Sequence, residues 1–145
     1  MKIVVQRAKN AKVIVDEKIV GKIDRGLMLL VGITHDDRIE DVKYCAKKVA
    51  NLRIFEDDDN KMNKSVMDIE GEILVVSQFT LAADCKKGTR PSFDNAQIPV
   101  VAQDMYEKFV NKLRESQINI KTGVFSAMMD VKLCNDGPVT IILEK

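Results

Sequence analysis

Hydroxyl and amide side chains follow directly on a short apolar run near the middle of the chain. The run is Ile73–Val76, and Ser77, Gln78, Phe79 and Thr80 come next. Consecutive apolar residues rich in β-branched types predict a strand that is covered on both faces. A buried strand that ends in hydroxyl and amide groups can form the floor of a small-molecule site. Such residues also commonly satisfy backbone groups at a strand end, and composition alone favours that second interpretation.

The sequence offers little conventional acid–base chemistry. His35 is the single histidine, and its place at an expected helix start makes capping its expected role. There is no Gly-x-Ser-x-Gly elbow, Walker loop or dinucleotide fingerprint, so Ser-His-Asp catalysis is not expected. An enzyme with this sequence would depend on backbone dipoles, on hydroxyl groups or on a group of its substrate. That limits the reaction to an intrinsically easy one, such as hydrolysis of an activated ester.

The dipeptide Gly137-Pro138 is a second candidate element of a site. Glycine lets a backbone approach a ligand closely, and proline removes a donor so that carbonyl groups remain exposed. The alternative is a tight turn between two terminal strands, which the spacing alone favours.

A long polar segment, Ala82–Ala96, contains the cations Lys86, Lys87 and Arg90 and the aromatic residue Phe93. Loops of this length in a compact domain tend to be functional or mobile. Cations close to an aromatic ring suit phosphate contact and base stacking, so the segment is a candidate nucleic-acid contact. An ordinary solvated loop is an equally good interpretation.

Neither a metal site nor a cofactor is predicted. The acidic run Asp57–Asp59 lacks the spacing, glycine and distal glutamate of a calcium loop. Cys45, Cys85 and Cys134 are far apart and form no CxxC pair, which argues against zinc and against a disulfide framework.

Composition is that of an ordinary globular protein rather than a disordered one. The chain has 145 residues, of which 46% are hydrophobic and 31% charged, so we expect a single domain over residues 1–145. The net charge of +1 creates no global field for a polyanion, so any basic surface must be local. No apolar run approaches membrane-spanning length, and Met1 leads directly into a strand-like segment. A cytoplasmic protein without membrane contact is therefore expected.

Periodicity predicts an α+β fold, with a mostly antiparallel, barrel-like sheet flanked by two long helices. Short β-rich runs fill the first third of the chain, and two more lie at its end. Helical spacing runs from Thr34–Asp37 to about Leu52, and again from Pro99 to about Ser116. The expected strands are Lys2–Arg7, Lys12–Val15, Lys18–Ile23, Leu27–Ile33, Leu52–Phe55, Asp130–Leu133 and Val139–Leu143.

Taken together, the motifs resemble a known family. Residues 77–81 (Ser-Gln-Phe-Thr-Leu) and 135–140 (Asn-Asp-Gly-Pro-Val-Thr) look like the two signature motifs of the D-aminoacyl-tRNA deacylases, also called the D-tyrosyl-tRNA deacylase family. The resemblance extends over essentially the whole chain. Further matching segments are 5–7, 51–55, 61–63 and 87–93.

The resemblance implies a homodimer that hydrolyses the ester between a D-amino acid and the terminal adenosine of tRNA, without a cofactor. In that family the Gly-Pro peptide is cis and reaches into the other subunit's pocket. Gly137 and Pro138 would therefore present carbonyl oxygens to the α-carbon of the substrate. Such a wall leaves room for hydrogen but not for a side chain, so L-amino acids would be rejected, while side-chain identity would matter little and glycine would not be excluded.

The same resemblance assigns roles to other residues. Ser77, Gln78, Phe79 and Thr80 form the catalytic side, with the Phe79 amide as donor to the ester carbonyl. The ribose 2′-hydroxyl, and not Thr80, is expected to help activate water. The remaining implied residues are Arg7, which holds the Gly-Pro loop, Met129 in substrate binding, and Lys86, Lys87 and Arg90 in tRNA binding.

Three residues depart from the family pattern. Ser126 stands where glycine is usual, Ala82 replaces a commonly aromatic residue, and Asn60 replaces a glycine. Asparagine tolerates the left-handed conformation, so the last change is mild. Two alternatives to a hydrolase remain at this level. One is a non-catalytic dimer that binds tRNA or nucleotides, and the other is a purely structural dimer.

Overall fold

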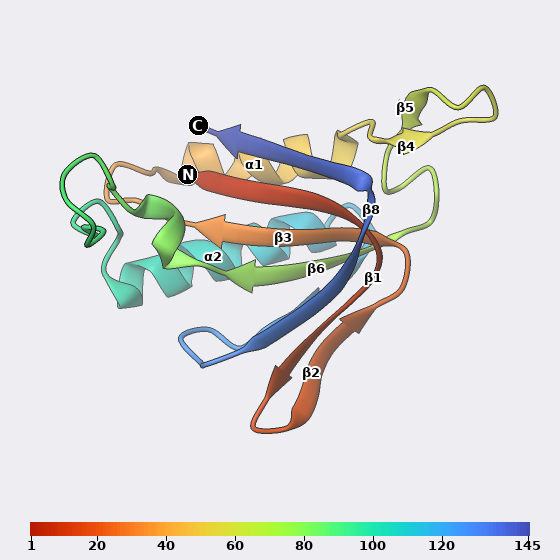
Figure 1. Ribbon diagram of the computed structural model, residues 1–145. Coiled ribbons are helices and arrows are strands. Elements are labelled where there is room, and N and C mark those ends of the chain that lie inside the picture. Colours follow the sequence, from red (N-terminus) through yellow and green to blue (C-terminus); the bar gives the residue numbers. More distant parts are fainter.

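The computed structural model describes all 145 residues. Its main sheet has six strands in the order β2-β1-β3-β6-β7, with β8 paired to β1 (Figure 1). A separate two-stranded ribbon is formed by β4 and β5. The strands are β1 (Lys2–Val15), β2 (Lys18–Ile23), β3 (Gly26–Gly32), β4 (Phe55–Glu56), β5 (Met62–Lys64), β6 (Glu72–Ser77), β7 (Asn119–Thr122) and β8 (Asp130–Glu144), and the helices are α1 (Ile39–Asn51), the 3₁₀ helix η1 (Phe79–Ala82) and α2 (Pro99–Arg114).

The long strand β1 organises the sheet. Its first half pairs antiparallel with β3, its second half pairs antiparallel with β2, and β8 runs antiparallel beside both halves. The sheet curls so far that β2 meets β7: a side chain on Gly21 would place its Cβ 2.5 Å from the carbonyl oxygen of Thr122. The expectation of an α+β fold with a barrel-like sheet is therefore confirmed. Antiparallel pairs dominate, but β6 lies parallel to both of its neighbours, β3 and β7.

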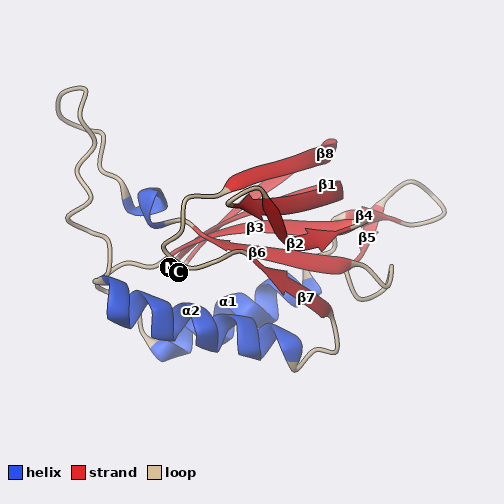
Figure 2. Ribbon diagram, turned by 90° about the horizontal axis from the view of Figure 1, so that it is seen from below, coloured by secondary structure: helices blue, strands red, loops and turns tan.

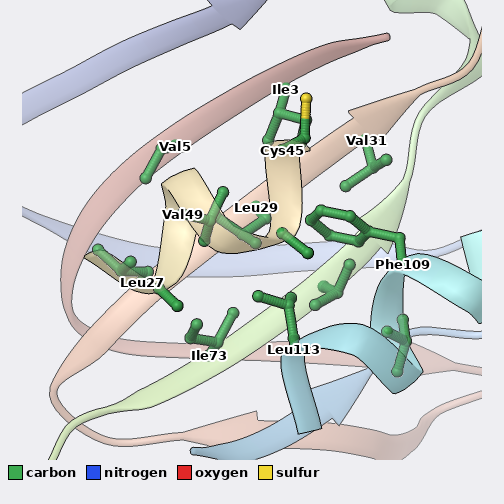
Figure 3. Close-up of a cluster of buried hydrophobic side chains, with 14 of the residues drawn as sticks. Ile3, Val5, Leu27, Leu29, Val31, Cys45, Val49, Ile73, Phe109 and Leu113 are labelled. Atoms are coloured by element: carbon green, nitrogen blue, oxygen red, sulfur yellow. The ribbon is translucent and has the colours of Figure 1, made fainter. Parts of the chain in front are cut away.

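Both helices cover the same face of the sheet (Figure 2). Their apolar residues recur at helical spacing and meet the alternating inward residues of β1, β3 and β6. Figure 3 shows this core, in which Phe109 and Leu113 of α2 and Val49 of α1 lie against the sheet. The stripe on α2 is thus core, as its spacing predicts.

The opposite face carries no α-helix. Where the sheet curls, the face is covered by its own second half, which buries a small cluster that includes Ala11, Val13 and Leu74. Nearer the chain termini η1 approaches this face at Gly32, where an added Cβ would lie 2.8 Å from Cβ of Leu81, and the face beside it is partly open to solvent. Here Val4 stands opposite Leu30 on one side and Ile142 on the other, and 64% of the Ile142 surface is exposed.

Several elements differ from the sequence-based expectations. Segments 2–7 and 12–15 are one strand, because β-bulges between Gln6 and Asn10 absorb the polar break. Likewise 130–133 and 139–143 join into β8, so Gly137-Pro138 does not form a tight turn between two strands. Helix α1 begins only at Ile39, and the strands β5 and β7 were not predicted. A strand was expected over residues 52–55, but β4 begins only at Phe55.

No helix of the protein is both long enough and apolar enough to cross a membrane.

Candidate active site

The end of β6 delivers the polar motif to the surface. Residues 73–76 are buried, which confirms the expected strand covered on both faces. The amide of Gln78 donates to the carbonyl of Val31 at 2.8 Å, which extends the ladder with β3 by one residue. The chain then tightens into η1, and Phe79 and Thr80 become exposed. The polar residues therefore do lie at a surface.

Within this motif the side-chain amide of Gln78 donates to the hydroxyl of Thr80. Phe79 and Thr80 are the first two residues of η1, so their amide groups have no acceptor inside that helix. The turn thus orients backbone donors as well as side chains.

An apolar pocket of about 690 Å³ opens beside the motif. It lies between the ends of β3 and β6, the start of α2 and the segment that joins β7 to β8. The rings of Phe79 and Phe93 meet edge to face on its wall, with centroids 5.2 Å apart. The lining also includes Ser77, Gln78, Phe125, Ser126 and Met129, and none of its residues is ionisable.

A shared carbonyl anchors the pocket wall to the sheet. The oxygen of Val75 accepts a hydrogen bond from the Tyr106 hydroxyl and another from the Gly123 amide, both at 2.9 Å. Burial raises the pKa of the Tyr106 phenol well above its usual value. A Cβ on Gly123 would lie only 2.7 Å from Sδ of Met129, so the glycine lets Met129 pack at the pocket. The wall is therefore positioned by buried contacts outside the pocket itself.

The cationic loop is an exposed hairpin. Asp84 and Ser92 exchange backbone hydrogen bonds of 2.8 and 3.0 Å, and Lys86, Lys87 and Arg90 stand between them at the tip. The tip is solvated, as either interpretation of the loop requires.

Lys86 also borders an open hollow of about 530 Å³ together with His35. The helix-capping role expected for His35 is wrong, since Arg38 is the N-cap residue of α1 and the His35 ring lies 3.2 Å from the carbonyl of Asn95. The only histidine is thus outside the apolar pocket.

Gly137-Pro138 has a cis peptide bond and lies in a bulge of β8. Gln6 pairs with Thr140 and Ala8 with Asn135, so four residues of β8 stand opposite the single residue Arg7. The glycine has φ +119°, a value that side chains rarely adopt.

Arg7 is buried beneath this bulge and holds it from below. Its Nε donates to the Asp136 carbonyl at 3.2 Å and lies 3.4 Å from the Asp136 carboxylate. Its Nη1 donates to the Ile54 carbonyl at 2.8 Å, and its Nη2 lies 3.5 Å from the Glu56 carboxylate. The guanidinium thereby links the bulge to β4.

The two motifs are far apart within one chain. Arg7 is in register with Leu27, and Leu27 with Ile73, so Ser77 lies four residues further along the sheet and three strands away from the bulge. At about 3.3 Å per residue and 4.8 Å per strand, this separation is roughly 20 Å. Figure 1 shows η1 beyond the arrowhead of β6, at the end of the sheet away from the sharp bend of β8.

Sequence reasoning missed several contributors. Phe125, Ile98 and Ala102 line the pocket, but they look like ordinary core or surface residues in the sequence. Asp136 lies within the motif, yet nothing local indicates that its partner is Arg7. Met129 joins Ser77–Phe79 in the pocket, whereas Gly137, Pro138 and Arg7 do not.

Comparison with known proteins gives consistent matches. Residues 4–144 match the family model described as D-Tyr-tRNA(Tyr) deacylase. A D-aminoacyl-tRNA deacylase of Brevibacillus brevis is 58% identical over 144 residues, with 99% of each chain covered. One from Clostridioides difficile strain 630 is 55% identical over 144 residues, covering 99% of this chain and 97% of that protein.

Two solved structures share the fold. One titled "c-Myc DNA Unwinding Element Binding Protein" has a TM-score of 0.94 and 43% identity, covering 100% of this chain and 99% of the other. A second, described as a probable eukaryotic D-amino acid tRNA deacylase, has a TM-score of 0.86 at 17% identity, covering 98% and 97%.

Proposed function

The chain belongs to the D-Tyr-tRNA(Tyr) deacylase family, and from that premise we propose that it is a chiral proofreading hydrolase, which releases D-amino acids and also glycine from tRNA. As a D-aminoacyl-tRNA deacylase it is a hydrolase that acts on the ester bond of aminoacyl-tRNA. The finer statements below concern how this chain performs that reaction, which we place in the cytoplasm.

The observation that carries the mechanism is a pocket without an ionisable side chain. General base catalysis requires a titratable group within hydrogen-bond reach of the proton that it removes. The side-chain partner of the Thr80 hydroxyl is the amide of Gln78, which cannot act as a base, so the hydroxyl is a poor nucleophile. The ribose 2′-hydroxyl of the substrate is adjacent to the scissile ester, and we assign the activation of water to it. The aminoacyl ester is reactive enough for this modest assistance.

The chain contributes electrostatic stabilisation. The amide of Phe79 stands at the start of η1, next to the pocket, and serves as donor to the ester carbonyl. Negative charge develops on that oxygen in the tetrahedral transition state, and a fixed donor stabilises it without reorganisation. The apolar walls strengthen the interaction because they exclude water. Ser77, Gln78 and Met129 complete this side of the site.

The opposite side is proposed to come from a second copy of the chain. Roughly 20 Å separates the bulge from Ser77 in one chain, too far for both to contact one ester. A two-fold axis would bring the bulge of each subunit to the pocket of the other, because such an interface uses the same patch twice. The partly exposed sheet face between the two elements supports this arrangement, since Leu30, Val4 and Ile142 form an apolar row across it.

The Gly137-Pro138 carbonyl groups would then face the α-carbon of the bound amino acid. A D-amino acid directs its side chain away from this wall, while an L-amino acid would push its Cβ into it. Glycine has no Cβ, so the wall does not exclude it. Arg7 keeps the wall in place through its contacts with Asp136.

The loop cations are proposed to contact the RNA. Lys86, Lys87 and Arg90 stand at an exposed hairpin tip, and Phe93 of the same hairpin joins Phe79 at the pocket. A strand whose terminal adenosine occupies the pocket would therefore pass close to these cations.

Deacylation of matched substrates tests the activity. The purified protein should release amino acid from D-aminoacyl-tRNA and glycyl-tRNA, and leave the L-form of the same aminoacyl-tRNA intact. Equal rates on the D- and L-forms, or release from neither, would refute chiral proofreading.

Complementation between two inactive variants tests the shared site. Phe79→Ala damages the pocket side, and Pro138→Ala damages the wall side. Mixed, refolded dimers would contain one site with both sides intact, giving about a quarter of the wild-type activity for random pairing of a two-fold dimer. In the control, a chain with both substitutions should only reduce the activity of the wild-type chain with which it pairs. No recovery in the first mixture would show that each chain builds its own site.

Non-catalytic binding is the second candidate. The missing ionisable group also fits a dimer that binds tRNA or nucleotides without turnover, and the 43% identical structure is titled a DNA unwinding element binding protein. Binding of acylated tRNA with no release of amino acid would favour this function.

A further inference from the structure

Three lysines stand side by side on the curled part of the sheet. Lys12 of β1 is directly opposite Lys22 of β2 on one side and Lys132 of β8 on the other. Directly opposed residues project from the same face of a sheet, with neighbouring strands about 4.8 Å apart. We call Lys22, Lys12 and Lys132 the lysine row.

The row faces outward. On each of the three strands the adjacent residues turn inward: Ala11 and Val13 are buried, and so is Ile23, while Val131 and Leu133 pack against the same small cluster. Side chains alternate along a strand, so the lysines lie on the outer surface. Lys22 and Lys132 are exposed, and Lys12 between them is half-buried.

No carboxylate neutralises the row. Five other lysines lie within 4.0 Å of an acidic oxygen, but none of these three does. The nearest acids along the strands, Asp24 and Asp130, stand two residues away from Lys22 and Lys132. Like charges directly opposite one another destabilise a sheet. An anionic partner would relieve that repulsion.

We propose that the lysine row binds backbone phosphates in the acceptor stem of the tRNA, an inference that rests on the proposed function. Lysine ammonium groups bind phosphates as point charges, without base specificity. A net charge of only +1 means that attraction to RNA must come from such local clusters.

The place of the row suits that partner. Lys132 is three residues, about 10 Å along an extended strand, from Met129 at the pocket. Val131 lines the pocket from the inner side of β8, and the row lies on its outer side. β8 pairs only with β1, so its other edge is open for RNA to pass from one side to the other.

The test compares two triple variants with equal loss of charge. One is Lys12→Gln/Lys22→Gln/Lys132→Gln. The control is Lys43→Gln/Lys47→Gln/Lys48→Gln, which removes three exposed lysines of α1. Affinity for tRNA that carries no amino acid is measured at several salt concentrations. Hydrolysis is measured on D-aminoacyl-tRNA and on D-aminoacyl-adenosine, which has no phosphates.

For three lost phosphate contacts, the slope of log affinity against log salt should become shallower by about 2 to 3, with about 100-fold weaker binding at 0.1 M salt. KM for the tRNA substrate should rise, while kcat and hydrolysis of the adenosine ester stay unchanged. The control should change neither slope nor KM. An unchanged slope in the row variant, or an equal loss in the control, would overturn the proposal.

Failure of the proposed function would appear differently. In that case the wild-type protein would not hydrolyse D-aminoacyl-tRNA. The salt dependence of binding to tRNA that carries no amino acid would still show whether the row contacts phosphates.

Discussion

Arg7 and Asp136 join two strands through both the backbone and the side chain of the aspartate. Nε of Arg7 donates to the Asp136 carbonyl at 3.2 Å and lies 3.4 Å from its carboxylate, while Nη1 reaches back to the Ile54 carbonyl. A single planar group thus holds the bulge from the buried side. The dipeptide next to Asp136 is the proposed chiral wall, so its precision depends on this contact.

Arg7→Lys should therefore reduce kcat/KM by about 100-fold. One ammonium group cannot reach the carbonyl groups of both Ile54 and Asp136. Misplacement of a catalytic element by about 1 Å has an effect of that size. Circular dichroism should show an intact fold. Because Arg7 acts on the wall, this variant should be complemented by Phe79→Ala but not by Pro138→Ala. Wild-type activity of Arg7→Lys would show that the contact is not needed.

Thr80→Ala should retain activity to within about tenfold. The hydroxyl accepts a hydrogen bond from the Gln78 side chain, and its loss frees that side chain without removing the backbone donors. Loss of a true nucleophile would instead lower kcat by on the order of 10⁶. Single-turnover deacylation of D-aminoacyl-tRNA separates these outcomes, and a near-complete loss with the fold intact would assign the nucleophile to Thr80.

Ser126→Gly should stabilise the protein. Ser126 has φ +62°, in the left-handed region that costs a non-glycine residue about 1 kcal/mol or more. Removing this strain should raise Tm by about 2–4 °C for a chain of this length. Asn60→Gly is the matched control, because Asn60 has φ +59° but asparagine tolerates that conformation. Equal shifts in the two variants would contradict the explanation by strain.

Tyr106→Phe should lower stability at neutral pH by about 1 kcal/mol, since the hydroxyl donates to the Val75 carbonyl from a buried position. Burial raises the pKa of the phenol above its usual 10.0. A raised pKa in the folded state gives stability that is complete below pH 10 and is lost as the pH rises further, at up to about 1.4 kcal/mol per pH unit.

Urea unfolding between pH 7 and pH 12 measures this loss, which the phenylalanine variant should lack. The surface hydroxyl of Tyr44 provides the control, and Tyr44→Phe should follow the wild-type curve. An identical alkaline decline in Tyr106→Phe would assign it to other groups.

The sequence by itself determined the local structure and the chemistry. Ile73–Val76 is a buried strand because four apolar residues in succession need cover on both faces. The apolar stripes of α1 and α2 are core because each helix must bury its apolar side. The expectation that the reaction needs no general base of the chain stays a prediction, because the capping role expected for the single histidine was wrong, although His35 lies outside the apolar pocket. The two signature motifs, together with the further matching segments in the same order, were sufficient to identify the family.

Only the tertiary structure decided which distant residues meet. The bulges in β1 and β8 change the register of the strands, and these bulges place Arg7 under Asp136 and align Lys12 with Lys22 and Lys132. Register depends on pairing across the whole sheet, so no local pattern of residues contains it. The register of the strands also places the Gly-Pro bulge and the Ser77 motif at different ends of the sheet within one chain. The sequence named both halves of the proposed site, and the sheet determined that one chain does not bring them together.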